Sequence, residues 1–217
     1  MSVHPKMPDE LVCICKRWSQ ILAKLKEQKE RIEYIQNELP ALLHNSGVFV
    51  ELLSNIVKGG RYPDIRQPQM FDDEILLYLN TQPIFSIRMF IYEPLAYTPI
   101  HDHNSWGVIG SALGKIGVVK YVRVDDGSVE DYARLHQAER VTLALGETDV
   151  ALPLDQGIHQ TGNADGHAGI MVSVYGRLIR RVYIQQFDME NNKVYRRYSP
   201  RVKKKLLAAE ALSVFKE

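Results

Sequence analysis

Two histidines separated by a single residue, His101 and His103, constrain this chain more than any other feature. They stand in the run His101-Asp102-His103-Asn104-Ser105-Trp106-Gly107. Side chains alternate along a strand, so both imidazoles would point to the same side of a sheet if this run is extended. Neutral imidazole is a common ligand of divalent transition metals. The pattern therefore predicts two metal ligands on one strand.

A third candidate ligand, His159, follows in the run Gly157-Ile158-His159-Gln160-Thr161-Gly162-Asn163. An open metal site uses three protein ligands and leaves the remaining positions for water or substrate. We therefore predict a mononuclear site formed by His101, His103 and His159. The alternation turns Asp102 away from its two neighbours, and we expect it to support the ligands rather than to bind the metal.

The composition is that of a soluble globular domain. A chain of 217 residues is long enough for one good core, and 27 basic against 26 acidic residues give a net charge of only +1. This balance argues against a general affinity for nucleic acid or for an anionic membrane surface. No apolar run approaches the roughly 20 residues that span a bilayer. We expect one domain over residues 1–217, in the cytoplasm, as a monomer or a homodimer.

The first part of the chain has helical periodicity. From Pro8 to Lys58, apolar residues recur at spacings of three and four, as in Leu11, Ile14, Trp18, Ile21, Leu22 and Leu25. A second helical segment is expected from Leu39 to Val57, and Gly59-Gly60 ends it. We expect residues 1–70 to form a helical cover over the rest of the domain. A dimerisation surface is the alternative for this part of the chain.

Short β-prone runs follow from Ile75 onward, separated by Gly, Pro, Asn or Asp. The runs are Ile75 to Tyr78, Ile84 to Tyr92, Gly107 to Ile109, Ile116 to Val124, Arg140 to Leu145, Asp149 to Leu152, Gly169 to Val174 and Arg181 to Phe187. Many short strands predict a sandwich or a small barrel, here over residues 71–200. Turns are expected at Asp125-Asp126-Gly127 and Asn191-Asn192.

A final helix is expected over residues 201–217. It begins with the basic run Arg201 to Lys205 after Ser199-Pro200. Apolar residues follow at Leu206, Leu207, Leu212 and Phe215. The spacing predicts an amphipathic helix.

Two stretches resemble the sequence motifs of the cupin family. Thr98-Pro99-Ile100-His101-Asp102-His103, followed by Trp106-Gly107, resembles the first motif. The second motif has glycine, proline, glycine, histidine and asparagine, which this chain matches at Gly146, Pro153, Gly157, His159 and Asn163. The resemblance implies a mainly β fold, the cupin double-stranded β-helix or small β-barrel, with the helical cover at the N-terminus and a C-terminal helix.

More narrowly, the motif HDH-x-x-WGVIG is similar to that of the thiol dioxygenases, especially the bacterial ones. This family contains cysteine dioxygenase and 3-mercaptopropionate dioxygenase. The similarity extends over roughly Ile75 to Pro200. Common cupins place a glutamate ligand shortly after the second histidine, where this chain has Gly107 and Val108. The resemblance implies one ferrous iron per chain held by three histidines. It also implies a small thiol substrate that dioxygen oxidises to a sulfinic acid.

The family usually carries Ser-x-His-x-Tyr after the third ligand, and this chain has Met171, Ser173 and Tyr175 at those three positions. Alternation places all three on one face of a strand. We expect Tyr175 and Ser173 to serve catalysis, with Met171 and Trp106 beside the site. A serine lacks an imidazole's pKa of about 6.5, so the relay of the family would be altered.

Arginine binds the substrate carboxylate in the family, because its planar fork matches a carboxylate. The early-strand position expected for that arginine falls near residues 71–75, which are acidic here. Arg177 and Arg181 are the expected substrate-binding residues, and Arg88 and Arg180 are further candidates. Arg177 would share the face of Tyr175 if the strand continues through Gly176.

Two other functions stay open at this point. The same three-histidine metal could serve a dioxygenase that cleaves a carbon–carbon bond. The chain could also be a non-catalytic cupin that binds a metal or a small molecule, which the missing relay histidine favours.

Overall fold

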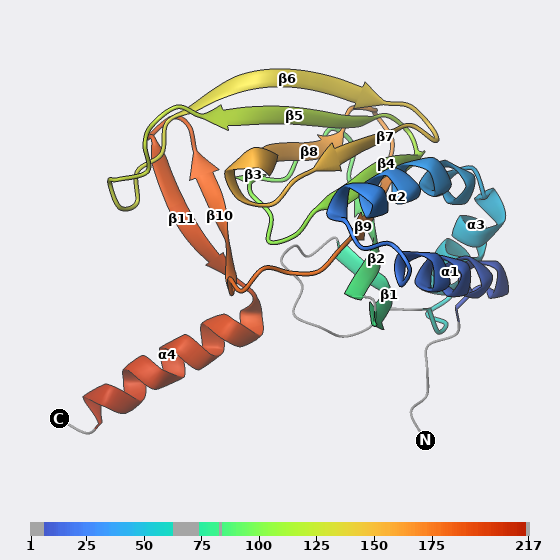
Figure 1. Ribbon diagram of the computed structural model, residues 1–217, viewed down its shortest axis with the longest axis horizontal. Coiled ribbons are helices and arrows are strands. Elements are labelled where there is room, and N and C mark those ends of the chain that lie inside the picture. Colours follow the sequence, from blue (N-terminus) through green and yellow to red (C-terminus); the bar gives the residue numbers. More distant parts are fainter. Residues whose placement is uncertain (1–6, 63–73, 83, 216–217) are drawn as a thin grey trace.

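The chain folds into a barrel of two facing antiparallel sheets, with helices at both ends (Figure 1). The computed structural model describes residues 7–62, 74–82 and 84–215. One sheet has the strand order β1-β2-β9-β4-β7, and the other has the order β11-β10-β3-β8-β5-β6. The strands are β1 (Glu74–Thr81), β2 (Ile84–Tyr92), β3 (Ile100–His101), β4 (Gly107–Leu113), β5 (Ile116–Arg123), β6 (Leu135–Leu143), β7 (Thr148–Ala151), β8 (His159–Asn163), β9 (Gly169–Tyr175), β10 (Tyr183–Asp188) and β11 (Lys193–Tyr198). The predicted mainly β class, a small barrel with helices at the N-terminal and C-terminal ends of the chain, is confirmed.

Three helices cover the outer face of the five-stranded sheet (Figure 1). They are α1 (Asp9–Leu22), α2 (Gln28–Leu43) and α3 (Ser46–Val57). Their apolar faces share one core with the outward residues of β2, β4 and β9, and Trp18 is completely buried there. Gly110 on β4 permits the close approach of α2, because a Cβ at this position would lie 2.5 Å from Leu43 Cδ1. The expected junction near residue 70 lies outside the described residues.

The helix predicted from Leu39 to Val57 is wrong as one element. The chain turns at His44 and Asn45, so that α2 ends and α3 begins within this range. The Asn45 side chain caps α3 by accepting a hydrogen bond of 3.3 Å from the Val48 amide. The predicted stop at Gly59 is confirmed, since this residue has φ +63°.

The eight predicted β runs all correspond to strands. The strand predicted to carry both His101 and His103 is reduced to β3, which ends at His101, and β8 and β11 were not predicted. β3 has only two residues, β8 contains a glycine and an asparagine, and β11 is rich in basic residues, so none of them has a typical β pattern. β6 also begins earlier than expected, at Leu135. The turn at Asp125 is confirmed by its carboxylate, which accepts a hydrogen bond of 2.9 Å from the Gly127 amide.

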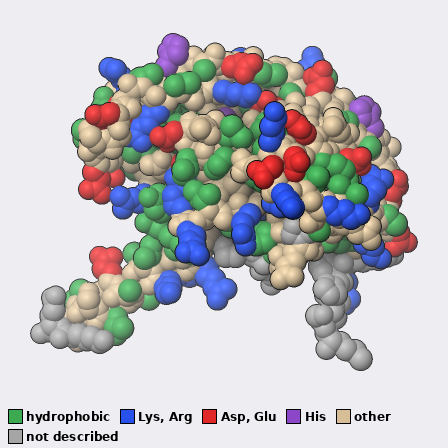
Figure 2. All heavy atoms as spheres, in the orientation of Figure 1, with side chains coloured by type: hydrophobic (Ala, Val, Ile, Leu, Met, Phe, Trp, Pro, Cys, Tyr) green, Lys and Arg blue, Asp and Glu red, His purple; other side chains and the backbone are tan. Residues whose placement is uncertain are grey.

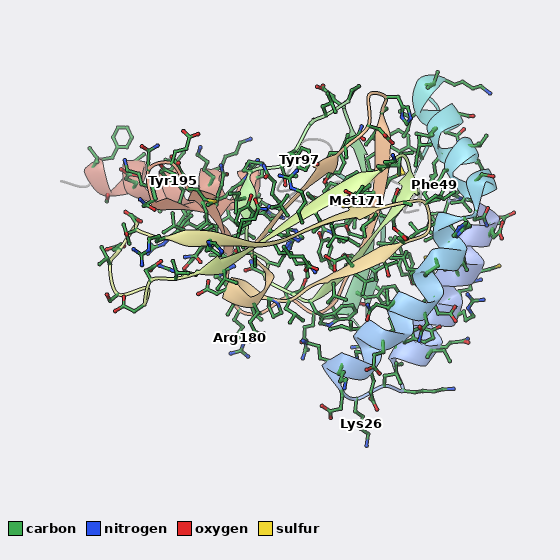
Figure 3. The ribbon with its side chains drawn as sticks, turned by 90° about the horizontal axis from the view of Figure 1, so that it is seen from above. Lys26, Phe49, Tyr97, Met171, Arg180 and Tyr195 are labelled. Carbon is green, nitrogen blue, oxygen red and sulfur yellow. The ribbon has the colours of Figure 1, made fainter. Side chains whose placement is uncertain are left out.

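The space between the sheets contains a small apolar cluster. It draws on both sheets and comprises Phe90, Tyr92, Ile109, Ile116, Val118, Leu143 and Met171. Met171 lies inside the barrel, between the strands of the two sheets (Figure 3). The cluster fills one part of the barrel and leaves the other part to polar side chains.

The C-terminal helix α4 (Pro200–Val214) is confirmed, but it does not pack as an amphipathic helix on the barrel. It extends away from the body of the molecule (Figure 1), and none of its residues is buried. Among the described residues, no helix combines the length and the apolar character needed to cross a membrane.

Truncation of Leu52 should destabilise the protein far more than truncation of Val57 on the same helix. Leu52 is completely buried, whereas Val57 is 86% exposed. We expect Leu52→Ala to lower the free energy of unfolding by about 2–5 kcal/mol, because it leaves a cavity. The matched variant Val57→Ala should change it by less than about 0.5 kcal/mol. Urea unfolding measures both, and equal effects would contradict this packing of α3.

Candidate metal centre

Three histidines converge inside the barrel. His101 ends β3, His103 lies just beyond that strand, and His159 begins β8. His101 and His159 are cross-strand partners in the only residue pair that joins β3 to β8 in the described ladder. One ring nitrogen of each histidine lies within 4.8 Å of the others, and the Nε2 atoms of His103 and His159 are 2.8 Å apart. The sequence motifs therefore identified side chains that meet in space.

Asp102, between the first two histidines, turns away from them as expected. Its carboxylate is fully buried and accepts hydrogen bonds of 2.8 and 2.6 Å from the Arg181 guanidinium. It also accepts a hydrogen bond of 2.7 Å from the backbone N–H of Gln185. β3 ends at His101, so strand alternation alone does not orient His103. The Asp102–Arg181 pair fixes the loop that carries His103.

Burial keeps all three imidazoles uncharged. It lowers the pKa of His101 to about 4, although a hydrogen bond with the Pro99 carbonyl acts in the opposite direction. Burial is the largest cause that lowers the pKa of His103 and His159 well below the ordinary range, and the neighbouring imidazoles are the next largest. The Pro99 carbonyl can only accept, so His101 carries its proton on Nδ1 and presents the Nε2 lone pair to the site.

The donor set fits a divalent transition metal. Imidazole nitrogen suits zinc, copper, iron and nickel, and three neutral ligands leave coordination positions open. No carboxylate or thiol of the described residues joins the three histidines. A metal would also satisfy the facing lone pairs of His103 and His159, which otherwise require a proton between them. The three histidines thus form a buried group that could hold a divalent metal ion.

Tyr175 lies directly beside this site. It is the last residue of β9, and its ring stacks on His103 with the centroids 5.7 Å apart. Gly107 on the adjacent strand permits this position, because a Cβ there would lie 2.7 Å from the tyrosine ring. Burial raises the pKa of Tyr175, while the Ser173 hydroxyl and Arg88 oppose the shift. The phenol is therefore protonated at neutral pH and can donate a hydrogen bond.

The other residues expected near the metal have different surroundings. Ser173 and Met171 share the interior face with Tyr175, as shown by their cross-strand partners Ile109 and Ser111 on β4. Met171 belongs to the apolar cluster between the sheets. Trp106 instead packs in the core beneath the helices, with its indole against Gly176.

The structure does not place the expected substrate-binding arginines in the site. Arg181 is bound by Asp102, and its Nε donates a hydrogen bond of 2.6 Å to Asn104. β9 ends at Tyr175, and Arg177 beyond it is exposed. Arg180 is also exposed and points away from the barrel (Figure 3).

Arg88, one of the further candidates, lies against the ring of Tyr175. Its guanidinium carbon lies 5.8 Å from the centroid of that ring, and it forms an ion pair with the buried Glu74 of β1. Burial lowers the pKa of Arg88, and Tyr175 opposes this shift. Glu74 was not predicted. The sequence offered one signal for a buried counter-ion: Arg88 is the single charged residue in the run Ile84–Tyr92, and it lies on the strand that pairs with β9.

Two further polar groups lie near the histidines and were not predicted. Lys120 is the cross-strand partner of His159, and its Nζ bridges Asp149 at 2.7 Å and Glu139 at 3.3 Å. On the opposite side, Arg197 of β11 donates a hydrogen bond of 3.3 Å to Gln186, the cross-strand partner of His101. Both connections depend on strand pairing, which the sequence alone does not display.

Comparison with known proteins gives structural similarity without a family assignment. No family model matches the chain. A cupin 2 conserved barrel domain protein from Rhodopseudomonas palustris is 14% identical, with a TM-score of 0.38 over 54% of this chain and 67% of that one. A second such protein, from Salinispora arenicola CNS-205, is 16% identical, with a TM-score of 0.33 over 51% and 82%.

Hydroquinone 1,2-dioxygenase PnpCD, solved with Cd2+ and 4-hydroxybenzonitrile, is also similar. It is 12% identical, with a TM-score of 0.36 over 48% of this chain and 64% of that one. These likenesses cover about half of the chain. The strand order defines the fold, and the histidine cluster defines the candidate site.

Removal of one ligand should abolish stoichiometric metal binding. We expect the wild-type protein to bind one divalent metal, and His103→Ala to weaken binding by more than the roughly 10–100-fold that loss of an outer partner costs. His136 is exposed on β6, and His136→Ala should bind metal as the wild type does. Calorimetric titration with Co2+ measures both affinities. Unchanged binding by His103→Ala would contradict the assignment.

The metal-free protein should lose stability in mild acid. The pKa of His101 is about 4 in the folded state and about 6.5 in the unfolded chain, so the unfolded chain binds the proton first. The stabilisation is complete above pH 6.5 and is lost as the pH falls toward 4. Urea unfolding at several pH values should show this fall. It should persist in His136→Asn and be smaller in His101→Asn.

Proposed function

We propose that this protein is an iron-dependent dioxygenase that oxidises a small thiol to its sulfinic acid with dioxygen. The observation that carries the proposal is the neutral set of His101, His103 and His159 with Tyr175 stacked beside it. Three uncharged ligands leave the full charge of a divalent metal uncompensated. Such a metal favours an anionic ligand, and a thiolate is the metal-binding form of a thiol.

The reaction adds both oxygen atoms of O2 to one sulfur atom, converting RSH to RSO2H. Bound iron would supply the centre at which the thiolate and dioxygen react. The protein supplies the buried setting, in which the closely packed Phe90 and Met171 exclude water from part of the barrel. The sequence resemblance to thiol dioxygenases favours this reaction over others at the same ligand set.

The Tyr175 hydroxyl is the proposed hydrogen-bond donor to the substrate. Its ring position is limited by His103 on one side and by Gly107 on the adjacent strand. Ser173 can support this hydroxyl by hydrogen bonding but cannot accept a proton near neutral pH as an imidazole would. We therefore assign Tyr175 to orientation of the substrate and not to proton transfer.

The test is oxygen consumption by the anaerobically iron-loaded protein with a panel of thiols. The panel contains cysteine, 3-mercaptopropionate, cysteamine, mercaptosuccinate and bulkier thiols, and mass spectrometry detects a gain of two oxygen atoms. Uptake with one thiol that is lost in His103→Ala supports the proposal. Bound iron without uptake contradicts it and favours the metal-binding alternative, whereas uptake with a diketone substrate favours the carbon-cleaving one.

Removal of the Tyr175 hydroxyl should slow the reaction without removing the metal. A hydrogen bond to a charged group contributes about 1.5–3 kcal/mol, so we expect Tyr175→Phe to lower kcat/KM by roughly 10- to 100-fold. Tyr34 lies on α2 in the helical cover, and Tyr34→Phe is the matched control. Equal activity of Tyr175→Phe and the control would exclude the proposed role.

A further inference from the structure

The C-terminal helix α4 exposes apolar side chains along its length. It leaves the barrel after β11 and extends into solvent (Figure 1), and the space-filling view shows hydrophobic side chains on it with basic ones near its start (Figure 2). The exposed fractions are 46% for Leu206, 54% for Leu207, 53% for Leu212, 66% for Val214 and 89% for Phe215. No described part of this chain buries a residue of α4.

A helix of this kind is not expected to be stable by itself. Isolated helices shorter than about 12–15 residues are marginal in water, and most helices in proteins are held by packing of an apolar face. α4 has 15 residues, at the upper end of this range, and the described residues give it no such packing. An exposed group of large apolar side chains is typical of an interaction surface.

One face of α4 has the spacing of a helix pair, with Leu206 as its large exposed apolar residue. Val202, Leu206, Ala209 and Ser213 follow at spacings of four, three and four, which places them in one stripe. The small residues at its second half permit close approach of another helix. Lys203 and Glu210 are seven residues apart, so they lie on the same flank of this stripe but too far apart to pair within the helix.

We propose that α4 pairs with α4 of a second copy of this chain, in an antiparallel arrangement with twofold symmetry. Rotation about a twofold axis keeps each flank of the stripe on its own side, so Lys203 of one copy meets Glu210 of the other, and the reverse pair forms as well. The basic residues at the start of each helix also lie toward the C-terminal end of the other, where the helix dipole is negative. Lys203 and Glu210 of one α4 are thus complementary to Glu210 and Lys203 of a second α4.

The test is the oligomeric state of the full chain by sedimentation equilibrium, with or without metal. We expect a dimer of twice 24.8 kDa. Leu206→Glu should give a monomer with an unchanged circular dichroism spectrum of the barrel, since no core residue is altered. Lys203→Glu and Glu210→Lys should each raise the dissociation constant about tenfold, through two lost pairs and two like-charge contacts.

The charge-exchanged variant Lys203→Glu/Glu210→Lys should restore the wild-type dissociation constant. Lys204 lies on the opposite side of α4, and Lys204→Glu is the matched control that should leave the dimer unchanged. A monomeric wild-type chain overturns the proposal. So does a dimer that tolerates Leu206→Glu, or one that Lys203→Glu and Lys204→Glu affect equally.

Discussion

Burial of three uncharged imidazoles at one point of the barrel is the constraint on which the rest of the structure depends. The desolvation that lowers their pKa values leaves nitrogen lone pairs facing one another at distances as short as 2.8 Å. Such an arrangement is unfavourable without a proton or a cation between the rings. Binding of a metal would therefore stabilise the barrel, because the metal would satisfy groups that folding brings together.

The ligands stay in place through contacts that lie outside the metal site. His103 and His159 are 56 residues apart and come from different elements, and a single cross-strand pair joins β3 to β8. The buried Asp102–Arg181 pair compensates for this short ladder by fixing the loop after His101 to the start of β10. Loss of either partner would leave a buried charge uncompensated, which is costly. Arg181 is thus a structural residue.

The sequence predicted the three histidines that meet and the mainly β class because both have local patterns. The H-x-H spacing, apolar alternation and turn residues are visible within a few positions. The features that the sequence did not predict depend on residues that are far apart in the chain. Asp102 and Arg181 are 79 residues apart, and the interior position of Arg88 follows only from the register of β2 with β9. β8 was not predicted, and β3 is shorter than the H-x-H run predicted, because both are set by pairing with other strands and not by β propensity.

The pairing of β1, β2 and β9 also places a cation beside Tyr175. Ser173 is the cross-strand partner of Arg88, whose guanidinium lies over the Tyr175 ring. The cation next to the tyrosine therefore comes from a neighbouring strand and stays charged, whereas an imidazole would exchange its proton. A charge in this buried position requires a counter-ion, and Glu74 provides it. Glu74, an acidic residue in the segment where the resemblance predicts a carboxylate-binding arginine, thus stabilises the environment of Tyr175.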